Sequence, residues 1–211
     1  MKLTRSSVSR RARSSRGAGQ SERTTEGMPT ERIEAFSDGV FSVILTIMVL
    51  ELRAPRQVSW ATLATLLPPL LIYFLSFIVV AIIWVNHHRA FYLTPFVNQK
   101  VLWLNNHLLL WVSLIPFVTA LVGQDHGSSV SAALYGVVML GGSAAFSMLR
   151  LVISRLAEEP GSQAESIHRS AHRRNIIGLS LYAISIGAAF LSPLISYAIF
   201  TAVALLYFVP V

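Results

Sequence analysis

Residues 32–52, RIEAFSDGVFSVILTIMVLEL, form one continuous helical pattern that joins charged residues to a long apolar run. The run is long enough to enter a bilayer, and Arg32, Glu34 and Asp38 lie at its start. Ionisable groups inside a membrane segment are energetically costly, so they need a partner or a function. What this segment does therefore decides what the protein does.

The composition indicates an integral membrane protein. Of 211 residues, 54% are apolar and 13% are charged, whereas soluble domains carry about 25% charged residues. The apolar residues are gathered in long runs, which is typical of membrane spans. The absence of cysteine excludes disulfides and thiolate metal sites. The net charge of +7 does not predict a nucleic-acid partner, because most basic residues flank the apolar runs.

Six apolar spans can be drawn, which predicts an all-α membrane protein with six transmembrane helices. They cover residues 33–52, 62–86, 101–122, 130–153, 175–191 and 194–209. The last two are shorter than the ~20 residues of an ordinary span, so a single kinked hairpin or a re-entrant pair is an alternative. We predict a disordered basic cytoplasmic tail over residues 1–30 and a transmembrane domain over residues 31–211. Within that domain, the polar stretch 157–172 is expected to be a mobile connector.

Basic residues set the orientation of the spans. If there are six spans, 15 of the 17 Lys and Arg residues fall on the side that carries both termini, and only Arg53 and Arg56 fall on the other. The positive-inside rule then places both termini in the cytoplasm of a multi-pass protein of the cell membrane. The basic tail is expected either to contact membrane lipids or to act only as an orientation signal.

Polar residues of the first three spans fall at a similar depth near the cytoplasmic side. We expect a network between helices in which Asp38 pairs with a histidine or with Arg32. Such a network would fix helix packing, act as a proton relay or gate, or hold a metal. Adjacent His87 and His88 point to different helix faces, and no HExxH pattern exists, so we predict no metal site and no catalytic residue. The candidate network residues are Arg32, Ser37, Asp38, Trp84, His87, His88, Asn105 and His107.

An apolar stripe runs along the first span. Val43, Ile47 and Leu50 fall on one side of a helix, with Gly39 preceding them and Thr46 at the border. Stripes of this kind are most often packing or lipid-facing surfaces. The functional alternative is a pore lining, in which apolar rings of an oligomer form a constriction that gates by dewetting.

The first span resembles the first helix of the transmembrane protein 175 family of lysosomal and prokaryotic potassium channels. The family signature Arg-x-x-x-Phe-Ser-Asp is matched by Arg32, Phe36, Ser37 and Asp38, and WVNHHRAF at 84–91 is similar to the end of the family's second helix. The resemblance covers residues 30–122, and the remaining spans agree in number and length. The chain is therefore expected to be a prokaryotic member with a single six-helix repeat.

This resemblance implies a homotetrameric channel whose first helix lines the pore. By position, the constriction rings would be Val43, Ile47 and Leu50, with Ser42 and Thr46 supplying nearby hydroxyls. Val43 departs from the isoleucine often found at the narrowest ring. The resemblance also implies that Arg32, Phe36, Asp38 and a histidine belong to a packing network, that K⁺ is the permeant ion, and that the protein is neither an enzyme nor dependent on a cofactor.

Three other functions remain open on the residues alone. A proton channel or proton-coupled transporter would use Asp38 and the histidines of the spans. A membrane enzyme would use those histidines in acid–base chemistry. A non-conducting membrane scaffold would use the polar residues only for packing.

Overall fold

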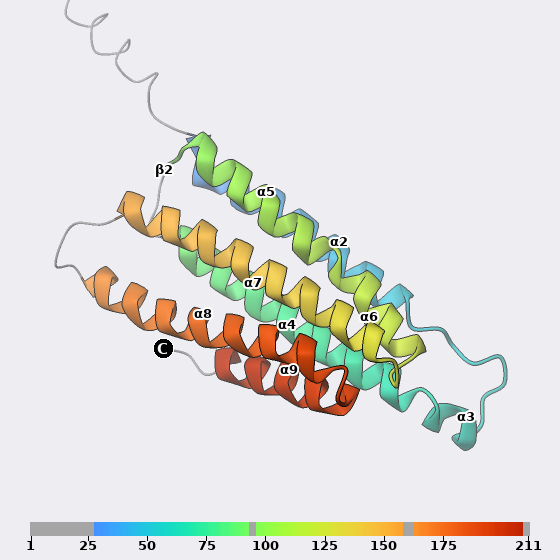
Figure 1. The fold of residues 1–211 in the computed structure, drawn as a ribbon. Helices are drawn as coiled ribbons and strands as arrows, with labels where there is room; N and C mark the ends of the chain where they lie inside the picture. Colours follow the sequence, from blue (N-terminus) through green and yellow to red (C-terminus); the bar gives the residue numbers. More distant parts are fainter. Residues whose placement is uncertain (1–27, 93–95, 158–162, 209–211) are drawn as a thin grey trace, which may run out of the picture.

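Long helices occur in the order and at the places of the six predicted spans (Figure 1). The computed structural model describes residues 28–92, 96–157 and 163–208. Within these ranges the helices are α2 (Thr30–Leu50), α3 (Trp60–Ala64), α4 (Leu67–Phe91), α5 (Gln99–Ser113), α6 (Ile115–Gln124), α7 (Ser129–Ala157), α8 (Gln163–Ala188) and α9 (Pro193–Phe208).

Four stretches are long and apolar enough to cross a membrane: Thr30–Leu50, Trp60–Phe91, Gln99–Gln124 and Ser129–Leu156. The prediction of an all-α membrane fold with six spanning helices is confirmed, and α8 and α9 supply the last two. These two are separate antiparallel helices joined by a turn before Pro193, as Figure 1 shows. The turn between them interrupts the helix, as the two separate spans predicted.

The third span is broken where we predicted one continuous helix. α5 ends at Ser113 and α6 begins at Ile115, and the backbone N–H of Leu114 bonds Trp111 O in a tighter turn. Pro116 has no N–H to continue the α-helical ladder, and its ring crowds the preceding turn. The break therefore has a local cause in the sequence.

The stretch expected to be a mobile connector is helical over much of its length. α8 begins at Gln163, so the prediction of a loop over 157–172 is wrong for residues 163–172. Residues 163–172 contain neither Gly nor Pro and are rich in helix-forming residues, so nothing in this stretch stops a helix. Residues 158–162 lie outside the described ranges, as do residues 1–27 of the predicted tail.

A short pairing that the sequence did not indicate joins the start of α2 to the α4–α5 connection. Met28 pairs with Val97 and Pro29 with Phe96 in an antiparallel ladder formed by β1 (Met28–Pro29) and β2 (Phe96–Val97). Val97 is buried, so the ladder is anchored in the core. This pairing fixes where α2 enters the bundle.

α2 lies at one edge of the bundle. It packs on α4, α5 and α6, while α8 packs on α7 and α9 at the opposite edge (Figure 1). The side of α2 that faces the core carries Ile33, Phe41, Ile44 and Met48, all buried. Val43, Ile47 and Leu50 on another side of α2 stay exposed in the described part of the chain.

Candidate functional site

Three buried side chains form the centre of the predicted network. Asn105 of α5 donates from Nδ2 to Ser37 Oγ of α2 at 3.0 Å, and its Oδ1 lies 2.7 Å from His87 Nε2 of α4. An amide oxygen can only accept, so His87 donates its Nε2–H. The three residues are at most 1% exposed. The Asn105 amide of α5 is therefore the partner of one polar group on α2 and one on α4, inside an apolar core.

Aromatic rings enclose this centre. The His87 ring lies 5.7 Å from the Phe41 ring in an edge-to-face arrangement and 4.8 Å from the Phe91 ring. These contacts exclude water from the imidazole and fix its orientation. Sequence reasoning did not name Phe41 or Phe91, because an aromatic residue inside an apolar run carries no signal that distinguishes it from ordinary core.

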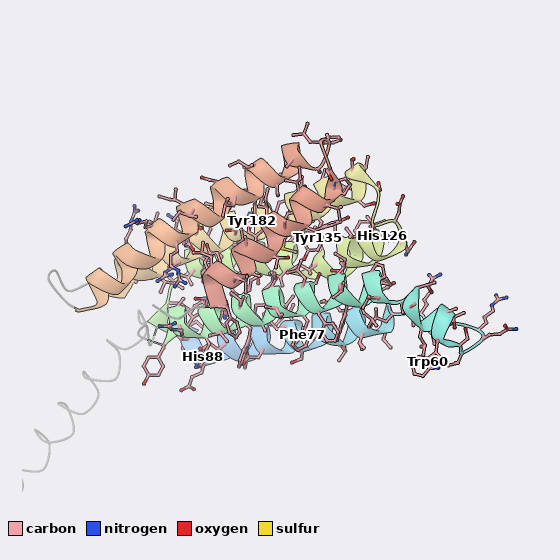
Figure 2. The ribbon with its side chains drawn as sticks, turned by 90° about the horizontal axis from the view of Figure 1, so that it is seen from below. Trp60, Phe77, His88, His126, Tyr135 and Tyr182 are labelled. Carbon is pink, nitrogen blue, oxygen red and sulfur yellow. The ribbon has the colours of Figure 1, made fainter. Side chains whose placement is uncertain are left out.

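A second, more exposed layer joins α2 to α4 beside that centre. Trp84 Nε1 donates to Asp38 Oδ1 at 2.8 Å, and His88 Nδ1 lies 3.1 Å from Glu34 Oε1. The Trp84 and His88 rings stack with their centroids 6.4 Å apart. Two i, i+4 pairs, one on each helix, thus face each other as a four-residue ladder. Figure 2 shows His88 at the end of the bundle opposite Trp60.

The partner predicted for Asp38 was wrong. Asp38 bonds Trp84, whereas Arg32 is exposed and forms no hydrogen bond or ion pair with another residue that the structure describes. Phe36 is also exposed, at 59%. Sequence position gives the depth of a residue along a helix, but the partner depends on how each helix is rotated in the bundle.

His107 lies outside the network. Its ring is on the exposed side of α5, where Trp111 of the same helix donates from Nε1 to His107 Nε2 at 3.4 Å. The prediction that adjacent His87 and His88 point to different faces is confirmed, because His87 is buried and His88 is exposed. Glu34, which was not among the network candidates, takes the place beside His88.

The apolar stripe of α2 is on the outside of the single chain. Val43, Ile47 and Leu50 are 55%, 42% and 79% exposed. The hydroxyls of Ser42 and Thr46 donate to Asp38 O and Val43 O of their own helix, at 2.8 Å each. The stripe is therefore free to contact lipid or another subunit, and it is not part of this chain's own core.

A groove borders this stripe. It measures about 550 Å³ and runs between α2 and the α5–α6 segment, lined among others by Gly39, Val43, Ile47, Phe117 and Leu121. Gly39 has no atom within 4 Å of where a Cβ would stand. The groove leaves room for a helix of another molecule to approach the backbone of α2.

A second cluster of buried polar side chains links α4, α6 and α7 in the middle of the bundle. Thr119 of α6 donates to Ser76 Oγ of α4 at 2.7 Å, and Ser76 Oγ lies 3.0 Å from the Tyr135 hydroxyl of α7. All three residues are buried, and Figure 2 shows Tyr135 inside the bundle. No spacing in the sequence indicates this group, since single hydroxyl residues inside apolar runs are common.

Comparison with known proteins connects this geometry to a family. The family described as endosomal/lysosomal potassium channel TMEM175 matches residues 32–116, which include nearly all of α2, the whole of α4 and the buried network. A potassium channel of Chryseobacterium sp. (strain P1-3) is 40% identical over 183 residues, which cover 87% of this chain and 94% of that protein. The chain belongs to the TMEM175 family. It is thus a multi-pass membrane protein of an ion-channel family.

Other TMEM175 relatives agree with this assignment. A potassium channel of Streptomyces collinus is 32% identical and aligns with 83% of this chain and 90% of its own length. The crystal structure of a lysosomal potassium-selective channel TMEM175 homolog from Chamaesiphon minutus superposes with a TM-score of 0.73 at 29% identity, covering 84% of this chain and 95% of that one. The resemblance stated from the first span is therefore confirmed.

One TMEM175 relative carries a different name. An endosomal/lysosomal proton channel of Gallus gallus is 26% identical over 82% of this chain, but the match covers only 38% of that protein.

Proposed function

We propose that this chain is a passive, potassium-selective cation channel of the cell membrane, with both termini in the cytoplasm. Four copies assemble around a central pore that α2 lines. The observation that carries the proposal is the exposed stripe of Val43, Ile47 and Leu50 on a helix at the edge of the bundle. The relatives named potassium channels, and the related structure described as potassium-selective, support K⁺ as the permeant ion.

The stripe fits a constriction by its spacing. At 1.5 Å per residue, Val43 and Leu50 lie about 10 Å apart along the helix axis, so they would form stacked apolar rings in an oligomer. Narrow apolar rings empty of water and so close a pore without a moving plug. Exposed Ser42 and Thr46 lie beside the rings and offer oxygen atoms to an ion that has lost part of its water shell.

The buried network has a positioning role in this proposal. Ser37, Asn105 and His87 link α2 to α4 and α5 through one amide. This link fixes the rotation of α2, and that rotation decides which side chains face the pore. The network is thus the structural support of the constriction and needs no ion of its own.

The proposal is tested by replacing one residue of the apolar stripe on α2 with a polar residue. Val43→Ser is expected to raise K⁺ flux into liposomes, because a hydroxyl ring holds water in the constriction. The matched control is Val49→Ser, since Val49 is similarly exposed on α2 at 48% but lies about 120° from Val43 around the helix. Equal flux from wild type, V43S and V49S would contradict the pore assignment.

A proton pathway is a second candidate, favoured by the contact of exposed His88 with Glu34 beside Asp38. A pH-sensitive dye in the same liposomes separates the two functions. Proton flux that is lost in His88→Gln, without a K⁺ flux, would select the proton pathway.

A further inference from the structure

A pocket lies at the end of the bundle where α2 ends and α4 begins. It measures about 360 Å³ and is formed by the loop after α2, the first two turns of α4 and the second half of α6. Figure 1 shows this loop leaving α2 beside α6 and passing to α3. Pockets that bind small molecules typically measure about 300–1,000 Å³. This pocket is therefore large enough for part of a lipid.

The lining of the pocket changes from charged to apolar with depth. Glu51 and Arg53 belong to the loop after α2, and Gln124 is the last residue of α6, so these polar groups lie at the helix ends. Tyr73 lines the pocket six residues beyond Leu67, the first residue of α4, which is about 9 Å along the helix. Much of the remaining lining is apolar and includes Met48, Leu52, Leu66, Pro69 and Leu70. A molecule in the pocket would thus place a polar head at the helix ends and an apolar part between the helices.

The length of α4 puts the charged rim of the pocket among lipid head groups. α4 has 25 residues and spans about 37 Å, whereas the hydrocarbon core of a bilayer is about 30 Å thick. His88 and Arg89 near the other end of α4 belong in the opposite head-group layer. The first residues of α4 therefore lie at the edge of the hydrocarbon, and Tyr73 lies among acyl chains. In the orientation proposed above, this is the outer leaflet, but the pocket itself depends neither on that orientation nor on the number of subunits.

The rim carries one charge of each sign. Glu51 and Arg53 are both exposed, and neither side chain forms an ion pair within the part of the chain that the structure describes. The carboxylate of Glu51 accepts hydrogen bonds from a cationic group, and the guanidinium of Arg53 matches phosphate oxygens in a bidentate manner. The rim therefore offers one group for an ammonium and one for a phosphate, above an apolar interior.

We propose that this pocket binds a zwitterionic phospholipid with a primary ammonium group, which is the head-group chemistry of phosphatidylethanolamine. Arg53 binds the phosphate, Glu51 accepts hydrogen bonds from the ammonium, and an acyl chain lies against the apolar lining. A phosphatidylcholine head group has no N–H, so it cannot donate to Glu51. A phosphatidylglycerol head group has no cation, so Glu51 repels it. The two charges together therefore select phosphatidylethanolamine.

The test measures which lipid the purified full-length protein retains. The protein is placed in vesicles of phosphatidylethanolamine, phosphatidylcholine and phosphatidylglycerol in equal amounts with identical acyl chains, and native mass spectrometry counts the lipids that stay bound in mild detergent. Wild type is expected to retain phosphatidylethanolamine about fivefold over phosphatidylcholine, which is the strength of one charged contact near a membrane surface. Equal retention of these two lipids would overturn the proposal.

Two substitutions separate the roles of the two charges. Glu51→Gln is expected to remove the preference for phosphatidylethanolamine over phosphatidylcholine without lowering the retention of phosphatidylcholine. Arg53→Gln is expected to lower the retention of both lipids about fivefold. Arg56→Gln is the matched control, because Arg56 is an exposed arginine of the same loop that lies outside the pocket lining. An equal loss in R56Q and R53Q would contradict the proposal, because the effect would then come from general surface charge.

A second arm distinguishes a lipid from a soluble molecule with the same head group. Phosphoethanolamine, which has the ammonium and the phosphate but no acyl chain, is added to protein loaded with phosphatidylethanolamine. The lipid is expected to stay bound, because the apolar lining holds its chain. Displacement by the free head group would overturn the assignment to lipid. Lipid retention is the readout in both arms, since Glu51 also borders the groove beside the apolar stripe and its replacement would alter ion flux with or without a lipid.

Discussion

At the scale of single residues, Asn105 is the most consequential side chain. Its amide is the common partner of Ser37 and His87, and all three are buried. Asn105→Ala is expected to destabilise the protein by about 2 kcal/mol, because two buried polar groups lose their partner. Asn106→Ala is the control, since Asn106 is the exposed neighbour on the same helix. Unfolding followed in detergent micelles measures both, and equal stabilities would contradict the role given to the network.

The same residues show how much of the buried network could be predicted from the sequence. Depth along the helices was predictable, because alternating spans bring Ser37, His87 and Asn105 to one level. Rotation was not predictable, so Asp38 was assigned a histidine or Arg32 and instead bonds Trp84. His107 is at a suitable level but on the wrong side of α5. The pore assignment of Val43, Ile47 and Leu50 stays a prediction, because a single chain shows only that they are exposed.

At the scale of helices, close packing of α5 on α7 depends on Gly141. A Cβ at this position would overlap the indole ring of Trp111, whereas a Cβ on Gly142 would lie 3.8 Å from Trp111 Cβ in ordinary contact. Gly141→Ala is expected to destabilise the protein by about 1–3 kcal/mol, as in overpacked cores. Gly142→Ala is expected to be neutral or stabilising, because Ala favours a helix. Unfolding in detergent compares the pair, and a G141A variant as stable as G142A would show that the indole moves aside without cost.

The helix boundaries could be predicted only where the sequence carries a strong local pattern. Six spans were found because long apolar runs are a strong signal. The break at Leu114 was not predicted, although Pro116 lies within the third span. The span was drawn from its apolar content, and apolar content does not show that Pro116 lacks the backbone N–H that an α-helix needs. The loop predicted over residues 163–172 is wrong for a different reason. Their polar composition suggested a loop, but none of these residues stops a helix. The β1–β2 pairing had no signal, since two residues per strand are too few for a pattern.

At the scale of the whole molecule, the position of α2 at the edge of the bundle requires another surface to cover its exposed side. That surface is either lipid or another subunit. The groove of about 550 Å³ beside the stripe, and the open space at Gly39, leave room for a helix of another copy. In the fourfold assembly that we propose, α2 would be the inner helix, and α8 and α9 would lie at the rim.

Cross-linking tests this arrangement in a chain that contains no natural cysteine. Val43→Cys is expected to form disulfide-linked dimers in the membrane under mild oxidation, because copies of α2 meet at the pore axis. Ile184→Cys is the control, since Ile184 is 59% exposed on α8 and would face lipid at the rim. Each variant carries a single thiol, so any linked band on a non-reducing gel reports one residue pair. Linkage through Ile184 without linkage through Val43 would place α8 at the centre, and α2 would then face lipid.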